Sequence, residues 1–212
     1  MKKIFLLLGG LIMSASVMAA PIKLMVFGDS LSVGYKIPEQ ASFCAQLEKA
    51  LQANKKNVVV LNYSKSGETT AGGVAKVNEV VDVKPDGVIL ELGINDALQK
   101  RDLNDTNEDL QTLISSFMDN GIPVFLVGME APADAPEDYR DAFRQMYADL
   151  ALENELLLYP FFMDGLWLEG GKHVSDDYFL EDGMHPSEKG VGIMVKRILP
   201  AIQQFLYEDV EK

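Results

Sequence analysis

Apolar runs and amphipathic stretches alternate along the chain after the first twenty residues. Continuous apolar runs, typical of strands buried on both faces of a sheet, lie at 23–27, 58–63, 88–92 and 124–127. A shorter run at 156–158 predicts a fifth strand. Apolar residues at helical spacing predict helices between these runs, at 43–54, 73–81, 108–118 and 137–152.

A last helix is predicted from 187 toward 207, and Pro200 is expected to kink or divide it. Strands and helices that alternate in this way predict a parallel sheet with helices on both faces. No repeat or shift in composition marks a second domain, so residues 20–212 are expected to form one domain. In open sheets of this kind ligands bind beyond the carboxyl ends of the strands, so the loops that follow the strands are expected to carry the chemistry.

The first nineteen residues have the pattern of a secretory signal peptide. Lys2 and Lys3 precede an apolar stretch at 4–17, and small residues lead to a cleavage site near Ala20. A membrane anchor is the alternative, but the stretch falls short of the roughly 20 residues that span a bilayer. The mature protein is therefore expected to be periplasmic or secreted, with no stable membrane insertion after cleavage.

The net charge of the chain disfavours some classes of binding partner. The chain has 19 Lys and Arg against 32 Asp and Glu, a formal net charge of −13. Such an acidic protein is a poor match for nucleic acid, and anionic membrane surfaces repel it. Cys44 is the only cysteine, which excludes an internal disulfide, and its apolar neighbours predict a buried, inert thiol.

Polar residues follow the first three predicted strands directly. The sequence reads Gly28-Asp29-Ser30 after the first strand, Ser66-Gly67 after the second and Gly93-Ile94-Asn95-Asp96 after the third. Gly28 is expected to permit a tight turn, and Asp96 to be a structural hydrogen-bonding residue behind Asn95. Taken alone, each segment is also a plausible turn. Ser30 taken alone is also explained by a role as the N-terminal cap of a helix.

A late segment adds the group that a serine nucleophile needs. A seryl hydroxyl requires a base to take its proton, and the base requires an acceptor that fixes its tautomer. Asp182 precedes His185 by three residues on a short turn with Gly183, so its carboxylate can reach the Nδ1–H of the ring. The other histidine, His173, lies in a polar segment and is expected to be a surface residue. Two histidines and one cysteine do not predict a metal site.

Together and in order, these segments resemble the SGNH or GDSL-type hydrolases, a family named for its serine, glycine, asparagine and histidine. The resemblance covers residues 23–199. The four family motifs are matched by Gly28-Asp29-Ser30-Leu31-Ser32, by Gly67, by Gly93-Ile94-Asn95-Asp96 and by Asp182-Gly183-Met184-His185. Within the family the chain looks most like bacterial periplasmic acyl-CoA thioesterases, lysophospholipases and arylesterases. One departure is Ile94, where close relatives often carry glycine.

The resemblance implies a flavodoxin-like three-layer α/β/α sandwich with a central parallel sheet of about five strands. It implies that Ser30 is the nucleophile, that His185 is the base and that Asp182 orients it. The oxyanion hole would consist of the backbone N–H groups of Ser30 and Gly67 and the side-chain amide of Asn95. The implied reaction is hydrolysis of a small-molecule acyl ester or thioester without a cofactor, by a monomer.

Two other functions compete with this interpretation. The same family includes enzymes that remove acetyl groups from carbohydrates, which would require a shallow polar cleft. An apolar segment at 161–167 disfavours that alternative if it lines a groove for an acyl chain, although ordinary core packing explains it equally well. A non-catalytic ligand-binding protein would require a lesion in the motifs, and the sequence contains none.

Overall fold

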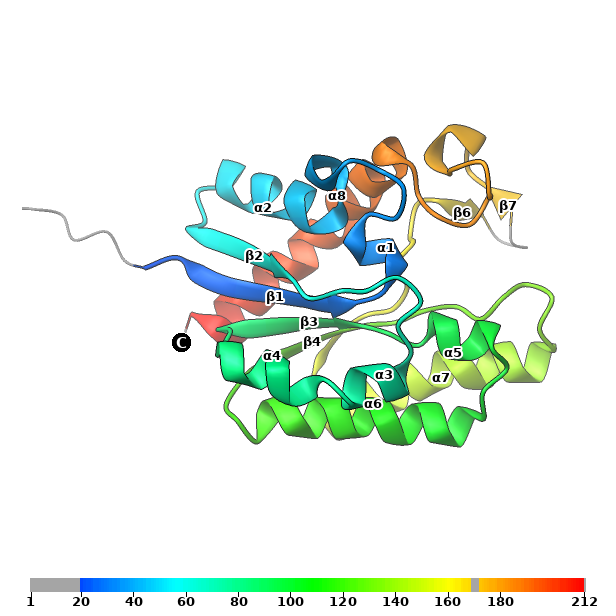
Figure 1. Ribbon diagram of the computed structural model, residues 1–212, viewed down its shortest axis with the longest axis horizontal. Helices are drawn as coiled ribbons and strands as arrows, with labels where there is room; N and C mark the ends of the chain where they lie inside the picture. The colour runs from blue at the N-terminus through cyan, green and yellow to red at the C-terminus, as the bar shows by residue number, and fades with distance from the viewer. Residues whose placement is uncertain (1–19, 169–171, 212) are drawn as a thin grey trace, which may run out of the picture.

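A computed structural model describes residues 20–168 and 172–211, and the predicted signal peptide lies outside these residues. Five parallel strands form the central sheet in the order β2-β1-β3-β4-β5 (Figure 1). The strands are β1 (Ile22–Gly28), β2 (Val58–Asn62), β3 (Gly87–Glu91), β4 (Val124–Val127) and β5 (Leu157–Tyr159). This is the flavodoxin-like order, whose switch point lies between β1 and β3.

The burial of the central strands explains their apolar sequences. Every residue of β3 and β4 is buried, as expected for strands covered by helices on both faces. β1 is buried from Leu24 to Gly28, whereas β2 at the edge of the sheet buries only Val58 fully. All five predicted strands are confirmed. Each end lies at the predicted residue or one residue from it.

Helices cover both faces of the sheet (Figure 1). One layer contains α2 (Phe43–Ala53) and α8 (Glu188–Phe205), which pack against each other. The other contains α3 (Thr70–Val74), α4 (Val77–Val83), α6 (Leu103–Met118) and α7 (Glu137–Glu153). Shorter elements are α1 (Ser30–Val33), α5 (Ile94–Leu98), a hairpin of β6 (Trp167–Leu168) and β7 (Lys172–His173), the 3₁₀ turns Glu39–Ala41 and Asp176–Tyr178, and the π-helical turn Leu206–Val210.

Two helix predictions need correction. The single helix expected at 73–81 is two helices, because Thr69 caps an earlier start and the chain breaks at Ala75–Lys76 before α4. Pro200 was expected to kink or divide the last helix, and of these two outcomes the division does not occur, because α8 continues through Pro200. Pro200 and Lys196 both lie on the exposed face of α8, so the carbonyl left without its usual N–H partner can be solvated.

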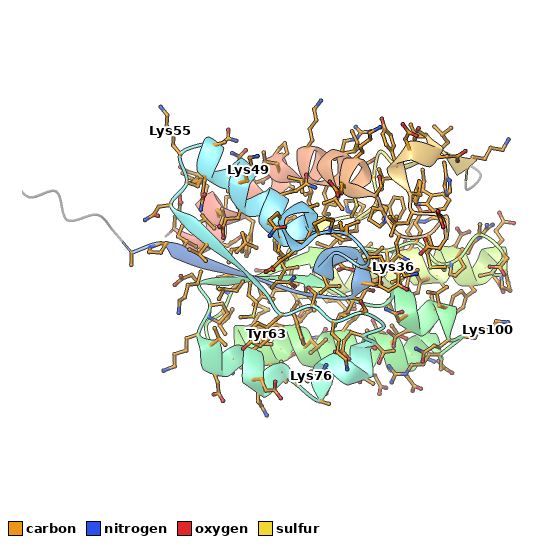
Figure 2. The ribbon with its side chains drawn as sticks, turned by 45° about the horizontal axis from the view of Figure 1, so that its top comes forward. Lys36, Lys49, Lys55, Tyr63, Lys76 and Lys100 are labelled. Atoms are coloured by element: carbon orange, nitrogen blue, oxygen red, sulfur yellow. The ribbon has the colours of Figure 1, made fainter. Side chains whose placement is uncertain are left out.

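The core is apolar, and Cys44 belongs to it with only 4% of its surface exposed. The prediction of a buried thiol is confirmed, and this burial raises the pKa of Cys44. Among the described residues, no helix is both long and apolar enough to cross a bilayer. The exposed lysines on and after α2, Lys49 and Lys55, are labelled in Figure 2.

Both described ends of the chain lie at the amino edge of the sheet (Figure 1). The N–H of Ile22, at the start of β1, donates to the carbonyl of Asn57 over 2.8 Å. Glu211 forms an ion pair of 2.7 Å with Lys56, just before β2. The loops that follow β1, β2 and β3 lie at the opposite edge.

Candidate active site

Ser30 stands where β1 passes into α1. Asp29 caps this short helix, because its carboxylate accepts the N–H of Leu31 over 2.9 Å. Ser30 is therefore the first helical residue and not the cap, so its hydroxyl is free for another partner. That partner is His185, whose Nε2 lies 3.0 Å from the Ser30 Oγ.

The role of Gly28 differs from the one that the sequence predicted. Its φ angle is not in the left-handed region, so no tight turn requires it. Glu91 is its direct neighbour in the register of β1 and β3, and a Cβ at position 28 would overlap the Glu91 carboxyl group. Glycine is needed here because of this close approach.

Glu91 and Asp29 form a buried carboxyl pair beneath the site. Both side chains are inaccessible to solvent. Glu91 Oε2 accepts the Ser32 hydroxyl over 2.5 Å and the Asp29 N–H over 3.3 Å, whereas Oε1 has no hydrogen-bond partner among the described residues. Burial raises the pKa of Asp29 to about 7 and raises that of Glu91 well above its usual range.

The turn at residues 182–185 holds His185 through one carboxylate. Asp182 Oδ1 accepts the backbone N–H groups of Met184 and His185 over 3.0 and 2.9 Å, and Oδ2 lies 2.9 Å from the ring Nδ1 of His185. Gly183 has a φ of +65°, which closes this turn at no steric cost. Partial burial raises the pKa of Asp182, but these hydrogen bonds outweigh it and lower the pKa to about 2.

Tyr35 is a site residue that sequence reasoning missed. Its ring lies 4.3 Å from the His185 ring, centroid to centroid, at an interplanar angle of 35°. The ammonium group of Lys36, labelled in Figure 2, lies 5.0 Å from the centroid of the same tyrosine ring. Tyr35 follows Ser30 by five residues, but nothing in this spacing indicates contact with a histidine 150 positions later.

Asn95 stands in the first turn of α5, after β3. Its amide Nδ2 donates to Asp29 Oδ2 over 3.0 Å and to the Glu68 carbonyl over 2.9 Å. Gly67, after β2, has a φ of +76°, and a Cβ there would meet only open space. Ser30, Gly67 and Asn95 line the same cleft.

Asp96 is buried behind Asn95, as the sequence predicted. It accepts the backbone N–H and the hydroxyl of Thr70 over 2.9 and 2.7 Å. Arg101 Nη1 donates to the same carboxylate over 3.0 Å and also pairs with Asp109. The network ties the start of α3 to α5 and so stabilises the loop that carries Asn95.

A cleft of about 690 Å³ opens over Ser30 and His185. Its walls are largely apolar and include Ile94, Leu98, Phe161, Met163, Trp167 and Met184. The apolar segment 161–167 was expected either to pack in the core or to line a groove for an acyl chain, and it does both. Phe162 and Leu166 are fully buried in the core, whereas Phe161 and Trp167 line the cleft.

His173 lies at the surface, as the sequence predicted, but it is only partly exposed. Its side chain is 22% exposed, because the ring stacks on Phe179 with the centroids 3.8 Å apart. Within residues 20–168 and 172–211, the only histidine hydrogen-bonded to Ser30 is His185.

Comparison with known proteins found matches over most of the chain. The GDSL-like Lipase/Acylhydrolase family matches residues 26–193. An arylesterase of Vibrio mimicus is 32% identical over 193 residues, which cover 90% of this chain and 88% of the relative. Thioesterase 1/protease 1/lysophospholipase L1 of Escherichia coli K12 is 28% identical, with the same coverage. The crystal structure of AlinE4, an SGNH-hydrolase family esterase, is 31% identical with a TM-score of 0.73 and covers 89% of this chain and 98% of its own.

Proposed function

Because the chain belongs to the GDSL-like lipase/acylhydrolase family and is an ester hydrolase, we propose that it cleaves acyl esters or thioesters with Ser30, His185 and Asp182. One observation carries the proposal. Two consecutive contacts, of 3.0 Å from Ser30 Oγ to His185 Nε2 and of 2.9 Å from His185 Nδ1 to Asp182 Oδ2, join a hydroxyl, a base and a carboxylate. This is the arrangement that activates a serine nucleophile.

The proposed reaction follows from these contacts. His185 Nε2 takes the hydroxyl proton as Ser30 Oγ attacks the acyl carbon, and the resulting imidazolium donates that proton to the departing alkoxide or thiolate. A water molecule then gives a proton to His185 as it attacks the acyl-enzyme. The imidazolium returns that proton to Ser30 Oγ as the bond from Oγ to the acyl carbon breaks, which releases the acid and restores the free enzyme. Asp182, whose pKa is about 2, stays negatively charged throughout and stabilises the imidazolium.

The negative oxygen of each tetrahedral intermediate needs hydrogen-bond donors. We assign this role to the backbone N–H groups of Ser30 and Gly67 and to the side-chain amide of Asn95, all on the same cleft. The three residues follow three neighbouring strands, so their positions are fixed before substrate binds. Donors that are preorganised in this way stabilise the transition state more than the ground state.

The walls of the cleft favour an acyl chain as the group next to Ser30. Phe161, Met163 and Trp167 contribute apolar surface to the cleft. Each methylene group of a substrate that is buried against such a surface contributes about 0.8 kcal/mol to the free energy of binding. We therefore propose substrates with an extended acyl group and a small or water-exposed leaving group. The Vibrio mimicus and Escherichia coli relatives have names that refer to aryl esters, thioesters and lysophospholipids. Each of these substrates contains an acyl ester or thioester bond.

We also propose that residues 1–19 are removed on export and that residues 20–212 act as a single domain, as a monomer, in the periplasm or outside the cell. Mass spectrometry of protein released by osmotic shock should find an N-terminus near Ala20. Recovery of the intact chain from the membrane fraction would support the anchor instead. Size-exclusion chromatography with light scattering tests the monomer.

Serine-directed labelling tests the catalytic assignment. An alkyl phosphonate ester should label the wild-type protein at Ser30, and Ser30→Ala should lose both labelling and nearly all hydrolysis while its melting temperature is unchanged. Ser64→Ala, which alters another partly buried serine at a strand end, is the matched control and should keep both. Labelling at a different serine would refute the assignment.

A substrate panel then tests the proposed acyl preference. Aryl esters and acyl thioesters of increasing chain length should be cleaved with rising kcat/KM until the cleft is filled. If acetylated sugars are cleaved faster than any of these, the enzyme is a carbohydrate deacetylase.

A further inference from the structure

His173 lies between the wall of the cleft and the turn that carries Asp182 and His185. It belongs to β7, where it pairs with Trp167 of β6. Its ring stacks on Phe179 at an interplanar angle of 16° and meets the Trp167 ring edge-on at 4.6 Å. The ring is therefore held on two sides by aromatic groups, and its orientation is set by packing.

This orientation directs one ring nitrogen at the turn. His173 Nε2 lies 3.0 Å from the carbonyl oxygen of Gly183. Gly183 stands in sequence between Asp182 and the two residues, Met184 and His185, whose N–H groups donate to the Asp182 carboxylate. The N–H of Gly183 donates to Leu180 on the other side of the turn over 2.9 Å. The peptide groups around Gly183 are thus fixed from both directions, by a backbone partner and by an imidazole.

The proton on His173 can be assigned from its partners. A carbonyl oxygen only accepts, so a hydrogen bond to Gly183 requires the proton on Nε2. The other nitrogen, Nδ1, lies 3.2 Å from Asp176 Oδ1, but the Asp176 side chain is fully exposed and can turn to water. The contact with Gly183 is partly buried, so water replaces it less readily than it replaces the exposed Asp176 carboxylate, and the tautomer with hydrogen on Nε2 is favoured.

We propose that His173 is a positioning residue for catalysis, whose Nε2–H holds the Gly183 carbonyl and so keeps the Asp182 carboxylate aligned with the His185 ring. The proposal rests on the proposed roles of Asp182 and His185. Without this donor the turn keeps its own hydrogen bonds but gains freedom around Gly183. A small displacement of the base is sufficient to slow proton transfer, since misplacing a catalytic group by about 1 Å can cost 10²-fold.

Two substitutions separate the donor from the ring. His173→Phe keeps the aromatic packing against Phe179 and Trp167 but removes the donor. His173→Gln loses the ring but retains an amide nitrogen the same number of bonds from the backbone as Nε2. We expect kcat for an aryl ester to fall about 10-fold in the Phe variant with KM nearly unchanged, and to return toward wild type in the Gln variant. Asp176→Ala, which removes the partner of Nδ1, is the control and should leave kcat unchanged.

A spectroscopic measurement supports the kinetics. The Nδ1–H proton of His185, hydrogen-bonded to Asp182, should give a low-field proton NMR signal in wild type that is absent from His185→Ala. That signal should shift or broaden in His173→Phe and not in Asp176→Ala. A merely structural role for His173 would lower the melting temperature without this pattern.

Each outcome decides the proposal. Wild-type kcat and an unchanged signal in His173→Phe overturn it, as do equal losses in the Phe and Gln variants or the failure of both to fold. Ser30→Ala, assayed in parallel, tests the proposed function separately. If Ser30→Ala remains active the catalytic assignment fails, whereas an inactive Ser30→Ala beside an unaffected His173→Phe refutes only the positioning role.

Discussion

The side-chain amide of Asn95 donates to the buried carboxyl group of Asp29 over 3.0 Å in the free protein. Its second hydrogen is directed at the Glu68 carbonyl over 2.9 Å, so both are engaged before any substrate binds. In the proposed oxyanion hole, an oxyanion would therefore have to draw one of these hydrogens away or share it. Since a full negative charge is a stronger acceptor than a backbone carbonyl, the exchange becomes favourable only as charge develops in the transition state.

Replacement of Asn95 should therefore affect turnover more than binding. We expect Asn95→Ala to lower kcat by about 10²–10³-fold with little change in KM, as for the loss of an oxyanion donor elsewhere. Steady-state kinetics on a short-chain aryl ester measures this. Asn104→Ala, at an exposed position of α6, is the control. A folded Asn95→Ala with near-wild-type kcat would place the third donor elsewhere.

Asp182→Asn should abolish the orientation of His185 while preserving the turn. Asparagine Oδ1 can still accept the N–H groups of Met184 and His185, but its amide nitrogen would face the ring Nδ1 and favour the wrong tautomer. We expect kcat to fall about 10⁴-fold, with little change in melting temperature. Asp177→Asn, an exposed carboxylate on the neighbouring 3₁₀ turn, is the control.

The charge of Asp182 also predicts the form of the pH profile. Its pKa is lowered to about 2, so the stability that it contributes is lost only as pH falls from about 4 toward 2. Above that range Asp182 should stay charged and contribute no proton to the acidic limb of kcat/KM. A limb whose slope requires the uptake of more than one proton would contradict this.

The buried carboxyl pair predicts a second, opposite dependence of stability on pH. Burial raises the pKa of both Asp29 and Glu91, so the folded state binds more protons than the unfolded state between about pH 4 and pH 7. The free energy of unfolding should therefore fall as pH rises through this window. Glu91→Gln should weaken that fall, because a neutral amide replaces one member. Urea denaturation of the wild type and Glu91→Gln at several pH values measures this difference. If the free energy of unfolding depends on pH in the same way in both proteins, the prediction is contradicted.

Asp96 should matter for stability as well as activity. Asp96→Ala leaves the Thr70 N–H without its acceptor, the Thr70 hydroxyl with Asp109 alone, and Arg101 with one carboxylate fewer. We expect a loss of about 3 kcal/mol in the free energy of unfolding, with reduced activity. Glu108→Ala, on the exposed face of α6, should change stability little. A variant of normal stability that has lost activity would instead indicate a direct role for Asp96 at the site.

The positions of the strands along the chain and the residues at their ends could be predicted because both depend on local sequence. Apolar runs identify the buried strands, and an aspartate three residues before a histidine on a glycine turn forms its contacts within the turn itself. The role of Gly28 could not be predicted, because it depends on the register that sets Glu91 beside it. Register is a relation between distant segments and leaves no trace in either one alone.

The same limit explains the two histidines. The environment of His185 is largely local, apart from the Ser30 hydroxyl and the Tyr35 ring. His173 has polar neighbours in sequence, and its partial burial arises only where Phe179 and Trp167 fold around it. Polar neighbours along the chain predicted a surface residue, but they did not indicate the aromatic rings that cover part of its side chain.

The position of the chain ends has a practical consequence for immobilising the enzyme on a solid support. Ile22 and Glu211 lie at the edge of the sheet opposite the cleft (Figure 1), so a tag on either end would tether the molecule with its cleft facing the solution. Amine coupling would lack this directionality, because exposed lysines occupy several faces. Lys36, above the Tyr35 ring that contacts His185, could tie the mouth of the cleft to the matrix (Figure 2).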